Sequence, residues 1–530
     1  MFSGRCDTLA ALPPMDPSSI SLGYGSALWR LEQQLDARSW RAANWLWARW
    51  QSRRRRSFIR PGLTLTNVVA AGALPVEQLV DALAGALDGG AFESACALGD
   101  SLLAELPTLS GEIAQRGREL VVEALLVAGD RARATRLARA HEGGLRGTSR
   151  GVSLLELLGL GDGAVWLPDG RPNLLGLSRR IAEGSLGADE LALKIGRKPR
   201  VWLQSPQLCL LFFMALRADD PERALGFFNR FLARQSLPRC HARRDPQPTS
   251  NLLADLEFEP LPKHREGPLV SVLMAARNAA ATIGYAVDSV LGQSYPWLEI
   301  LVCDDASEDD TLAILQRRYA SEPRVRLFRS AANQGAYNIR NALAARACGE
   351  FLTFHDADDL ALPSRIAAQL EPLRSAQVVV SVTSWMRVTP QGELVFFKNQ
   401  KAIRLSLVSM MIRRKAWDQV GPFRSARIGA DLELFADLRA RFGALGVARI
   451  RAPQILGLWS QSSATRSAGM EALEDGYRSP ARRLYSELVF RKGQHGADGV
   501  SDVEIDARLR VSGNYLQASP VLELHDRALA

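Results

Sequence analysis

The stretch from Gly349 to Pro363, GEFLTFHDADDLALP, constrains the fold more than any other part of the chain. Its apolar run has the length and aromatic content of a strand that is buried on both faces. Three carboxylates, Asp356, Asp358 and Asp359, follow directly. Because ligands bind at the carboxyl ends of strands in open α/β sheets, the stretch predicts a buried strand that ends at a binding edge.

Two interpretations of this acidic cluster are open from the stretch alone. Carboxylates this close together repel one another unless a cation neutralises them, so one interpretation is a divalent metal that carries a diphosphate. The other is an Asp-rich turn that caps the helix near Pro363. His355 alternates to the opposite face of the strand from Asp356, so we predict a structural role for it.

Length and composition predict a multidomain protein. The chain has 530 residues, several times the roughly 100 to 200 residues of a usual domain. The six Cys are scattered without a C-x-x-C pair, so neither a zinc site nor a disulfide framework is predicted. The amino terminus does not resemble a signal peptide, and no run approaches the roughly 18 apolar residues of a membrane span. These features predict a cytoplasmic protein, with a peripheral position at the inner membrane as an alternative.

Residues 1–62 are predicted to be a leader with one Trp- and Arg-rich helix. The formal net charge of +9 owes much to Trp40–Arg60, which holds seven Arg and no acid. Indole rings beside an Arg cluster suit a membrane surface with anionic lipid, or else packing of the Trp side chains on the following helical domain. We therefore predict a membrane-surface or protein contact through residues 40–60. Nucleic acid is not a predicted partner, because nothing else extends the basic surface.

Residues 63–260 have helical periodicity and predict an all-α domain. The segments ALDGGAFESACALGDSLL, ALLVAGDRARATRLARAH and ALRADDPERALGFFNRFL each predict a helix, a short polar turn and a second helix. This pattern suits stacked helical hairpins of the tetratricopeptide (TPR) type. Such an array serves as a scaffold or buttresses a neighbouring domain, and no catalytic residue is predicted in it.

Residues 268–470 follow a linker and alternate strands with helices. The predicted strands are 269–275, 298–303, 325–328 and 350–354, and the predicted helices are 281–291, 311–319 and 337–347. A βαβαβαβ series builds a parallel sheet with right-handed crossovers, so we predict a Rossmann-like, mostly parallel α/β domain. Residues 471–530 are predicted to be a helical arm and tail.

Polar groups follow all four strands at the same predicted edge. They are Arg277 and Asn278, Asp304 and Asp305, Asn333 and Gly335 with Arg340 in the next helix, and finally Asp356. Carboxylates here can accept hydrogen bonds from a base and a ribose, Gly allows close approach of the backbone, and Arg can meet a phosphate. One nucleotide site explains this pattern better than four independent capped turns.

In this order, the motifs VSVLMAARNAAATIG, LEILVCDDASEDDT, NQG and GEFLTFHDADDLALP resemble the nucleotide-sugar half of the inverting family 2 glycosyltransferases with the GT-A fold. The resemblance implies that Asp304 or Asp305 recognises the base. It also implies that Asp356 and Asp358 form a D-x-D pair that holds Mg²⁺ or Mn²⁺ on the donor diphosphate. Many members have an aromatic residue where Arg277 stands, which leaves the base open.

The segment GPFRSARIGADLELFADLRARFG predicts an amphipathic helix that opens with Asp431 and Glu433. The resemblance assigns the catalytic base to Asp431, which would take a proton from the acceptor hydroxyl; without it, a helix cap is the simpler interpretation. Glu433 is predicted to contact the acceptor or to support Asp431. Ala430 departs from the family, where many relatives have an acid. Residues 459–465 resemble the late loop that closes over donor phosphates.

The sequence therefore predicts a metal-dependent inverting glycosyltransferase of the bacterial surface-polysaccharide type. It would move a sugar from a nucleotide-sugar donor to a hydroxyl of a glycan or lipid-linked acceptor. The alternative is a non-catalytic nucleotide-sugar-binding scaffold that acts through its helical domain, and the full set of carboxylates argues against it. A nucleotidyltransferase would carry a Gly-rich basic loop after the first strand, and AARNAAATIG is not one.

Overall fold

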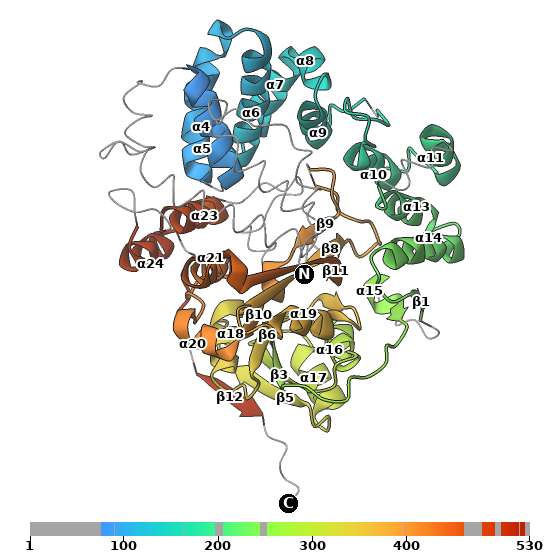
Figure 1. Ribbon diagram of the computed structural model, residues 1–530, viewed down its shortest axis with the longest axis vertical. Coiled ribbons are helices and arrows are strands. Elements are labelled where there is room, and N and C mark those ends of the chain that lie inside the picture. Colours follow the sequence, from blue (N-terminus) through green and yellow to red (C-terminus); the bar gives the residue numbers. More distant parts are fainter. Residues whose placement is uncertain are drawn as a thin grey trace, which may run out of the picture.

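The computed structural model describes residues 76–524, with gaps at 90, 163, 197–204, 244–251, 398, 460–479, 493–499, 513 and 519. The predicted leader at 1–62 and residues 460–465 of the predicted late loop lie outside the described residues. The described chain forms an arc of helices above an α/β part that is built on one large sheet (Figure 1).

The first part of the described chain is helical, as predicted. Its helices are α4 (Val76–Gly89), α5 (Phe92–Glu105), α6 (Gly111–Ala128), α7 (Arg131–Ala140), α8 (Glu142–Arg146), α9 (Ser149–Leu158), α10 (Leu174–Ala182), α11 (Ala188–Ile195), α13 (Leu208–Leu216), α14 (Pro221–Arg234) and α15 (Leu252–Asp255). The turn between α6 and α7 shows how one helix ends and the next begins. Gly129 adopts a left-handed conformation that ends α6, and the side chain of Asp130 caps α7 by accepting a hydrogen bond from Arg133 N. Phe212 of α13 stacks on Phe227 of α14, with ring centroids 4.7 Å apart. The TPR type of this array remains a prediction.

A small hairpin departs from the all-helical expectation for residues 63–260. β1 (Cys240–Ala242) pairs antiparallel with β2 (Leu256–Phe258). The Asn229 amide of α14 fixes β1, because it donates to Cys240 O and accepts from Cys240 N, both at 2.8 Å. Strands of three residues are too short to leave an alternating pattern, which is why periodicity does not predict them.

The second part alternates strands and helices. Its elements are β3 (Val270–Ala276), α16 (Ile283–Leu291), β4 (Leu298–Asp305), α17 (Thr311–Tyr319), β5 (Val325–Ser330), α18 (Gly335–Ala344), β6 (Phe351–Phe354), β7 (Asp359–Ala361), α19 (Arg365–Leu373), β8 (Val380–Val388), β9 (Ile403–Leu405), β10 (Met411–Arg413), α20 (Arg414–Val420), α21 (Ala430–Phe442), β11 (Val447–Leu458), α23 (Pro480–Lys492), α24 (Asp502–Val511) and β12 (Val521–Leu524). The sheet order is β12-β5-β4-β3-β6-β10-β8-β11-β7, with β9 paired to β8. β5, β4, β3 and β6 are parallel, as predicted, and β10 runs antiparallel to both β6 and β8. A Rossmann-like first half thus continues into a mixed second half.

Helices cover both faces of the sheet, because successive side chains of each strand point to opposite faces. Val272 and Met274 of β3 belong to a core that α16, α17 and α19 cover, and this core continues into the helical part. Leu273, between them, belongs to a second core under α18, α20 and α21. The strand ends are therefore the part of the sheet that remains open to a ligand.

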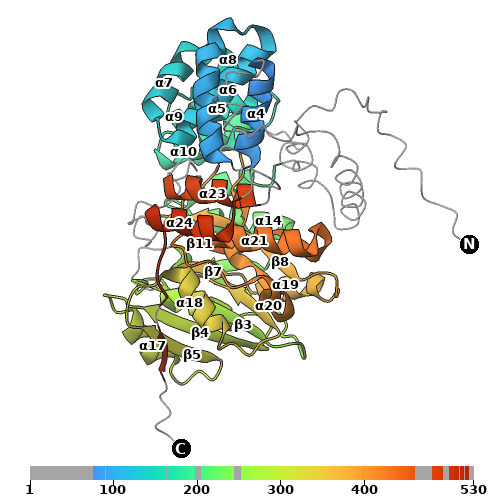
Figure 2. The ribbon, with the colours of Figure 1, turned by 90° about the vertical axis from the view of Figure 1, so that its left-hand side faces the viewer.

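Two seams join the helical part to the α/β part. In the segment between β8 and β9, buried Gln400 accepts from Leu175 N at 2.8 Å and donates to Ser153 Oγ at 2.8 Å. At the second seam, Arg483 Nε of α23 donates to Glu93 Oε1 of α5 at 3.1 Å. Figure 2 shows α23 lying between the helical part and α21. The helical array is thus packed directly on the sheet-containing part.

The carboxyl-terminal residues contribute to the sheet, which the prediction of an arm and tail does not anticipate. α23 is helical, as expected of the arm, but the predicted tail contains the helix α24 and the strand β12, which pairs antiparallel with β5 and places Val521 opposite Ser330. Arg326 of β5 reinforces the pair by donating to Glu523 at 3.0 Å. A four-residue edge strand after a long helical segment carries too little pattern to be predicted.

Candidate active site

The carboxyl ends of β3, β4, β5 and β6 meet at one edge of the sheet. The register places Ala276 of β3 beside Asp304 of β4, and Asp305 beside Ser330 of β5. β6 pairs with β3 on its other side and ends at Phe354. The loops that carry the predicted polar residues are therefore neighbours, as the strand pattern predicts.

The two acids that follow β4 have different surroundings. Asp305 accepts from Gln334 N at 2.9 Å and from Gly335 N at 2.8 Å, so it caps the start of α18. Burial raises the pKa of Asp305. Asp304 is 1% exposed, its Oδ2 accepts from Ser307 N at 3.2 Å, and its Oδ1 has no hydrogen-bond partner among the described residues. Of the two carboxylates, Asp304 is therefore the one that keeps an oxygen without a partner among the described residues.

Gly335 and Asn333 form the turn into α18. Gly335 has a φ of +77°, and a Cβ at this position would lie 2.6 Å from Leu516 Cδ1, so both the conformation and the space call for glycine. Asn333 is exposed at the rim and its side chain accepts from Gly335 N at 3.2 Å. The turn thus presents backbone and one amide at the edge.

Arg277 and Asn278 brace the loops after β3 and β4. Arg277 donates to Asp305 O and to Ala306 O, each at 3.1 Å. Asn278 Oδ1 accepts from Glu308 N at 2.9 Å. Both side chains are engaged by the protein, so their positions support the shape of the edge.

The acidic turn after β6 contains two accessible carboxylates and one buried one. Asp356 and Asp358 are half-buried, whereas Asp359, the first residue of β7, is buried. Arg340 of α18 forms an ion pair with Asp356, and its guanidinium lies 5.8 Å from the centre of the Phe354 ring. Arg340 is buried and holds Asp356, and its predicted contact with a donor phosphate stays a prediction.

The oxygen donors of this turn fit a divalent cation. No group of three or more His, Cys, Asp or Glu in the described ranges is arranged as a complete metal cage. Mg²⁺ and Mn²⁺ need no such cage when they arrive with a diphosphate, since one or two carboxylates then suffice. Asp359 Oδ2 has no partner among the described residues, and burial followed by the charges of Asp356 and Asp358 raises the pKa of Asp359 well above its usual range. A cation here would relieve this repulsion.

His355 lies on the other side of the turn, in agreement with its predicted structural role. It is fully buried, with Nε2 3.1 Å from Asp359 O and Nδ1 2.8 Å from the Arg365 guanidinium. Burial, reinforced by the Arg365 charge, lowers the pKa of His355 well below its usual value. The ring is therefore a neutral brace for the turn.

Asp431 lies in the first turn of α21 and accepts a hydrogen bond from a tyrosine hydroxyl. Tyr337 of α18 donates to Asp431 Oδ1 at 2.8 Å, and the same hydroxyl accepts from Gly429 N at 3.2 Å. Tyr337 and Arg340 are three residues apart, so they lie on one side of α18. One helix thus reaches both Asp431 and Asp356. Tyr337 is not among the predicted site residues, and its i, i+3 spacing to Arg340 in NQGAYNIR is the sequence feature that indicates it.

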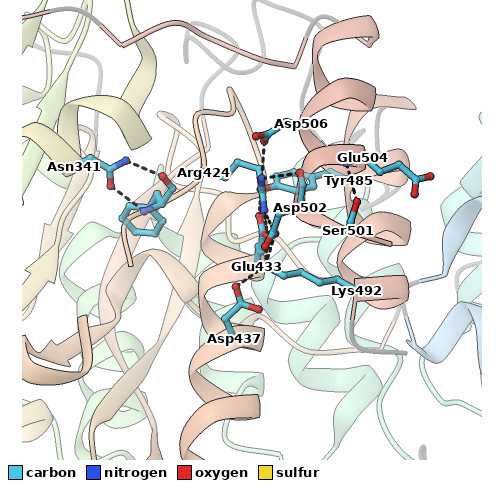
Figure 3. Close-up of polar contacts among 11 residues, drawn as sticks. Asn341, Arg424, Glu433, Asp437, Tyr485, Lys492, Ser501, Asp502, Glu504 and Asp506 are labelled. Atoms are coloured by element: carbon cyan, nitrogen blue, oxygen red, sulfur yellow. Dashed lines mark hydrogen bonds and ion pairs between the residues drawn. The ribbon is translucent and has the colours of Figure 1, made fainter. Parts of the chain in front are cut away.

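Glu433 lies in a buried ionic cluster and not at the open edge. Arg424 donates to its two oxygens at 2.8 and 2.7 Å, and Lys492 Nζ of α23 donates at 2.8 Å (Figure 3). Burial raises the pKa of Glu433, but these hydrogen bonds outweigh it, so the pKa lies below its usual value. These contacts fit the predicted support of Asp431, and because Glu433 also lines a cavity of about 400 Å³, the predicted acceptor contact stays a prediction as well.

A row of side chains beside Asp359 is a second feature of the site that is not predicted from the sequence. Gly457 of β11 pairs with Asp359 of β7 and with Arg387 of β8, so the three residues lie in one row across the sheet. The Arg387 guanidinium lies 4.1 Å from the centre of the Trp385 ring and 4.4 Å from that of Trp459. The i, i+2 patterns W-M-R and G-L-W place these residues on one face, but only the strand pairing brings them together.

Comparison with known proteins identifies relatives of the α/β part. Residues 271–434 match the family model described as Glycosyl transferase family 2. Chondroitin synthase of Escherichia coli is 38% identical over 130 residues, which cover 24% of this chain and 19% of that protein. The UDP-Glc:alpha-D-GlcNAc-diphosphoundecaprenol beta-1,3-glucosyltransferase WfaP of Escherichia coli is 32% identical over 117 residues, which cover 22% and 46%. Among solved structures, S. aureus TarS 1-349 in complex with UDP-GlcNAc aligns with a TM-score of 0.34 and 16% identity, over 45% of this chain and 69% of that chain.

The chain spans less than half of the length of the first curated relatives that it matches. The family match contains the acidic edge and extends through Asp431 and Glu433. Within the part of the chain that is described, no helix combines the length and the apolar character needed to cross a membrane.

Proposed function

We propose that the chain transfers a sugar, with inversion, from a nucleotide-sugar donor to an acceptor hydroxyl, because residues 271–434 match the model of glycosyl transferase family 2. One observation carries this proposal: α18 contacts Asp305, Asp356 and Asp431 at once. One helix thereby contacts the three carboxylates that the reaction would need near the nucleobase, the diphosphate and the acceptor.

In the proposed reaction, Asp431 accepts the proton of the acceptor hydroxyl as its oxygen forms a bond to the anomeric carbon. The bond from that carbon to the nucleoside diphosphate breaks on the opposite side, and the diphosphate leaves with the electron pair. Attack opposite to the leaving group inverts the configuration. When bound to Asp356 and Asp358, Mg²⁺ or Mn²⁺ would neutralise charge on the leaving diphosphate. Arg340 contributes by keeping the Asp356 carboxylate in place.

For donor recognition we propose Asp304 as the residue that reads the base. Its Oδ1 is buried and has no partner among the described residues, so it is ready to accept an N–H from a base or an O–H from a ribose. Asp305 and the turn at Gly335 would fix the backbone beside it. Arg277, Asn278 and Asn333 then shape the rim of the nucleotide site.

For the acceptor we propose a glycan or a lipid-linked glycan in bacterial surface-polysaccharide synthesis. The names of two relatives support this, one a chondroitin synthase and the other a transferase to a diphosphoundecaprenol-linked sugar. A lipid-linked acceptor would bring a cytoplasmic enzyme to the inner membrane. The basic segment 40–60 is the proposed contact with that surface.

The test is metal-dependent donor binding and turnover. A panel of nucleotide sugars is titrated into the wild-type chain with Mg²⁺ or Mn²⁺, and release of nucleoside diphosphate is followed in parallel. We expect Asp358→Ala to lose metal-dependent binding, and Asp431→Asn to keep binding but to lose about 10²- to 10⁴-fold in turnover. Asp418→Asn, which alters an exposed acid of α20, is the matched control and should behave as wild type.

Two results would contradict the proposal. If no donor binds, or if all variants behave alike, the acidic edge is structural. If a donor binds without turnover to any glycan or lipid-linked acceptor, the chain is a nucleotide-sugar-binding scaffold that acts through its helical array.

A further inference from the structure

The backbone just ahead of Asp431 is paired with a segment far downstream in the chain. Arg427 N donates to Asn514 O at 2.9 Å. The Asn514 side chain accepts from Ile428 N at 3.1 Å and donates to Ile428 O at 3.3 Å. Asn514 is fully buried, so water does not compete for these bonds. The chain is thereby fixed three residues before the proposed base.

The same downstream segment is anchored on α18. Asn338 of α18 donates to Leu516 O at 3.0 Å, and Leu516 N donates to Ser425 O at 3.3 Å. Residues 514–516 therefore lie between α18 and the loop that leads to Asp431. The helix that supports the acidic edge and the loop that presents the base share this support.

α23 supports the loop from a second direction. Gly429 has a φ of +88°, and a Cβ there would lie 2.6 Å from Tyr485 Cδ1, so the Tyr485 ring lies directly against the backbone of the turn. The Tyr485 hydroxyl donates to Glu433 Oε2 at 2.5 Å. Tyr485 thus contacts the chain two residues before Asp431 and two residues after it.

The ionic cluster around Glu433 completes the support. Arg424 donates to Glu433 and, at 2.6 Å, to Asp506 of α24, and it also pairs with Asp502 (Figure 3). Lys492 joins the same cluster from α23, 3.0 Å from Asp502. The first turn of α21 is consequently tied to both carboxyl-terminal helices.

We propose that this carboxyl-terminal support, formed by α23, α24 and residues 514–516, positions Asp431 for proton transfer, with Asn514 and Tyr485 as its main positioning residues. The inference rests on the proposed function, since it requires Asp431 to be the base. These residues act through Asp431 and touch no substrate. A displacement of about 1 Å at a reacting group can cost about 10²-fold in rate, so small losses of support are measurable.

The test separates turnover from donor binding in the full-length chain. Asn514→Leu removes both side-chain hydrogen bonds to Ile428 at similar volume, and we expect a loss of about 10- to 100-fold in kcat with the donor Kd unchanged. Tyr485→Phe keeps the ring against Gly429 and removes only the hydroxyl, so we expect a smaller loss in kcat. Ser512→Ala is the matched control and should leave activity unchanged, because Ser512 Oγ donates to Leu509 O at the end of its own helix and has no hydrogen bond to Ile428 or α21 in the described part of the chain.

A double-mutant cycle distinguishes positioning from general support. In the Asp431→Asn background, Asn514→Leu should cause no further loss of the residual turnover, because its effect passes through the missing base. An equal loss in both backgrounds would overturn the inference, as would an unchanged kcat in both Asn514→Leu and Tyr485→Phe. Parallel loss of donor binding in both variants would also overturn it. If Asn514→Leu does not fold, Tyr485→Phe carries the same cycle.

The cycle also separates this inference from the proposed function. If Asp431→Asn keeps full turnover, the proposed function fails on that variant alone. If Asp431→Asn is inactive while Asn514→Leu and Tyr485→Phe are fully active, the function stands and the positioning role fails.

Discussion

Replacing Arg424 with Met is expected to lower the free energy of unfolding by about 3 kcal/mol. Removal of one partner from a buried ion pair costs about 3 to 5 kcal/mol. The Arg424 and Glu433 side chains are 13% and 5% exposed, so this pair is buried. The lower end of the range applies because Lys492 still contacts Glu433 at 2.8 Å in the variant. Met keeps the apolar stem, so the loss reports mainly the guanidinium.

The assay is urea unfolding of the purified chain, followed by circular dichroism. The matched control is Arg508→Met on α24, where the Arg508 and Glu504 side chains are 44% and 41% exposed. An exposed i, i+4 pair contributes about 0.3 to 0.5 kcal/mol, so this control should unfold almost as wild type. The reasoning is refuted if Arg424→Met costs no more than Arg508→Met.

Three further predictions concern the same supports. Tyr337→Phe should lower kcat about tenfold or more with donor affinity unchanged, because a hydrogen bond to a charged group contributes about 1.5 to 3 kcal/mol. An unchanged kcat would contradict the role of the hydrogen bond from Tyr337 to Asp431. Arg340→Met should weaken metal-dependent donor binding, since Asp356 loses its ion-pair partner. Calorimetric titration of the donor in the presence of Mn²⁺ measures this, and an unchanged donor Kd would contradict a role for the ion pair. Glu433 has a lowered pKa, so its stabilising effect is full above its unfolded pKa of about 4.3 and is lost as the pH falls through the lower folded value. The unfolding free energy of wild type should therefore fall more steeply with acid than that of Glu433→Gln, and equal slopes in urea titrations would contradict this.

The parallel half of the sheet was predictable because each of its strands is a short apolar run followed by polar residues. In β4, the buried residues end at Asp304 and Asp305, and the same pattern recurs in β6 before Asp356. The chain order of such units fixes their topology through right-handed crossovers. The position of these acidic residues at the binding edge of the sheet thus follows from the local sequence pattern, without knowledge of distant contacts.

The contacts of the side chains at the edge were not predictable in the same way. Whether Arg340 points to a ligand or into the protein depends on which side of α18 faces β6, and periodicity gives that only approximately. Asn514 is a stronger case, because its side chain pairs with Ile428, 86 residues away. A polar residue in a weakly patterned tail carries no local sign of such a bond, so the support of the base could be found only from the fold.

α18 explains why the candidate site can be organised before any ligand binds. Its first turn is held by Asp305 and carries Tyr337, which reaches Asp431, and Arg340 reaches Asp356 from the next turn. A short helix is rigid, so these three carboxylates are fixed relative to one another by a single element. Groups that are already oriented need little reorganisation during the reaction, which is the main source of electrostatic catalysis. The carboxyl-terminal support is bonded to the same helix, because Asn338 of α18 donates to Leu516 O. Residues that are distant in sequence therefore act together as one rigid support for Asp431.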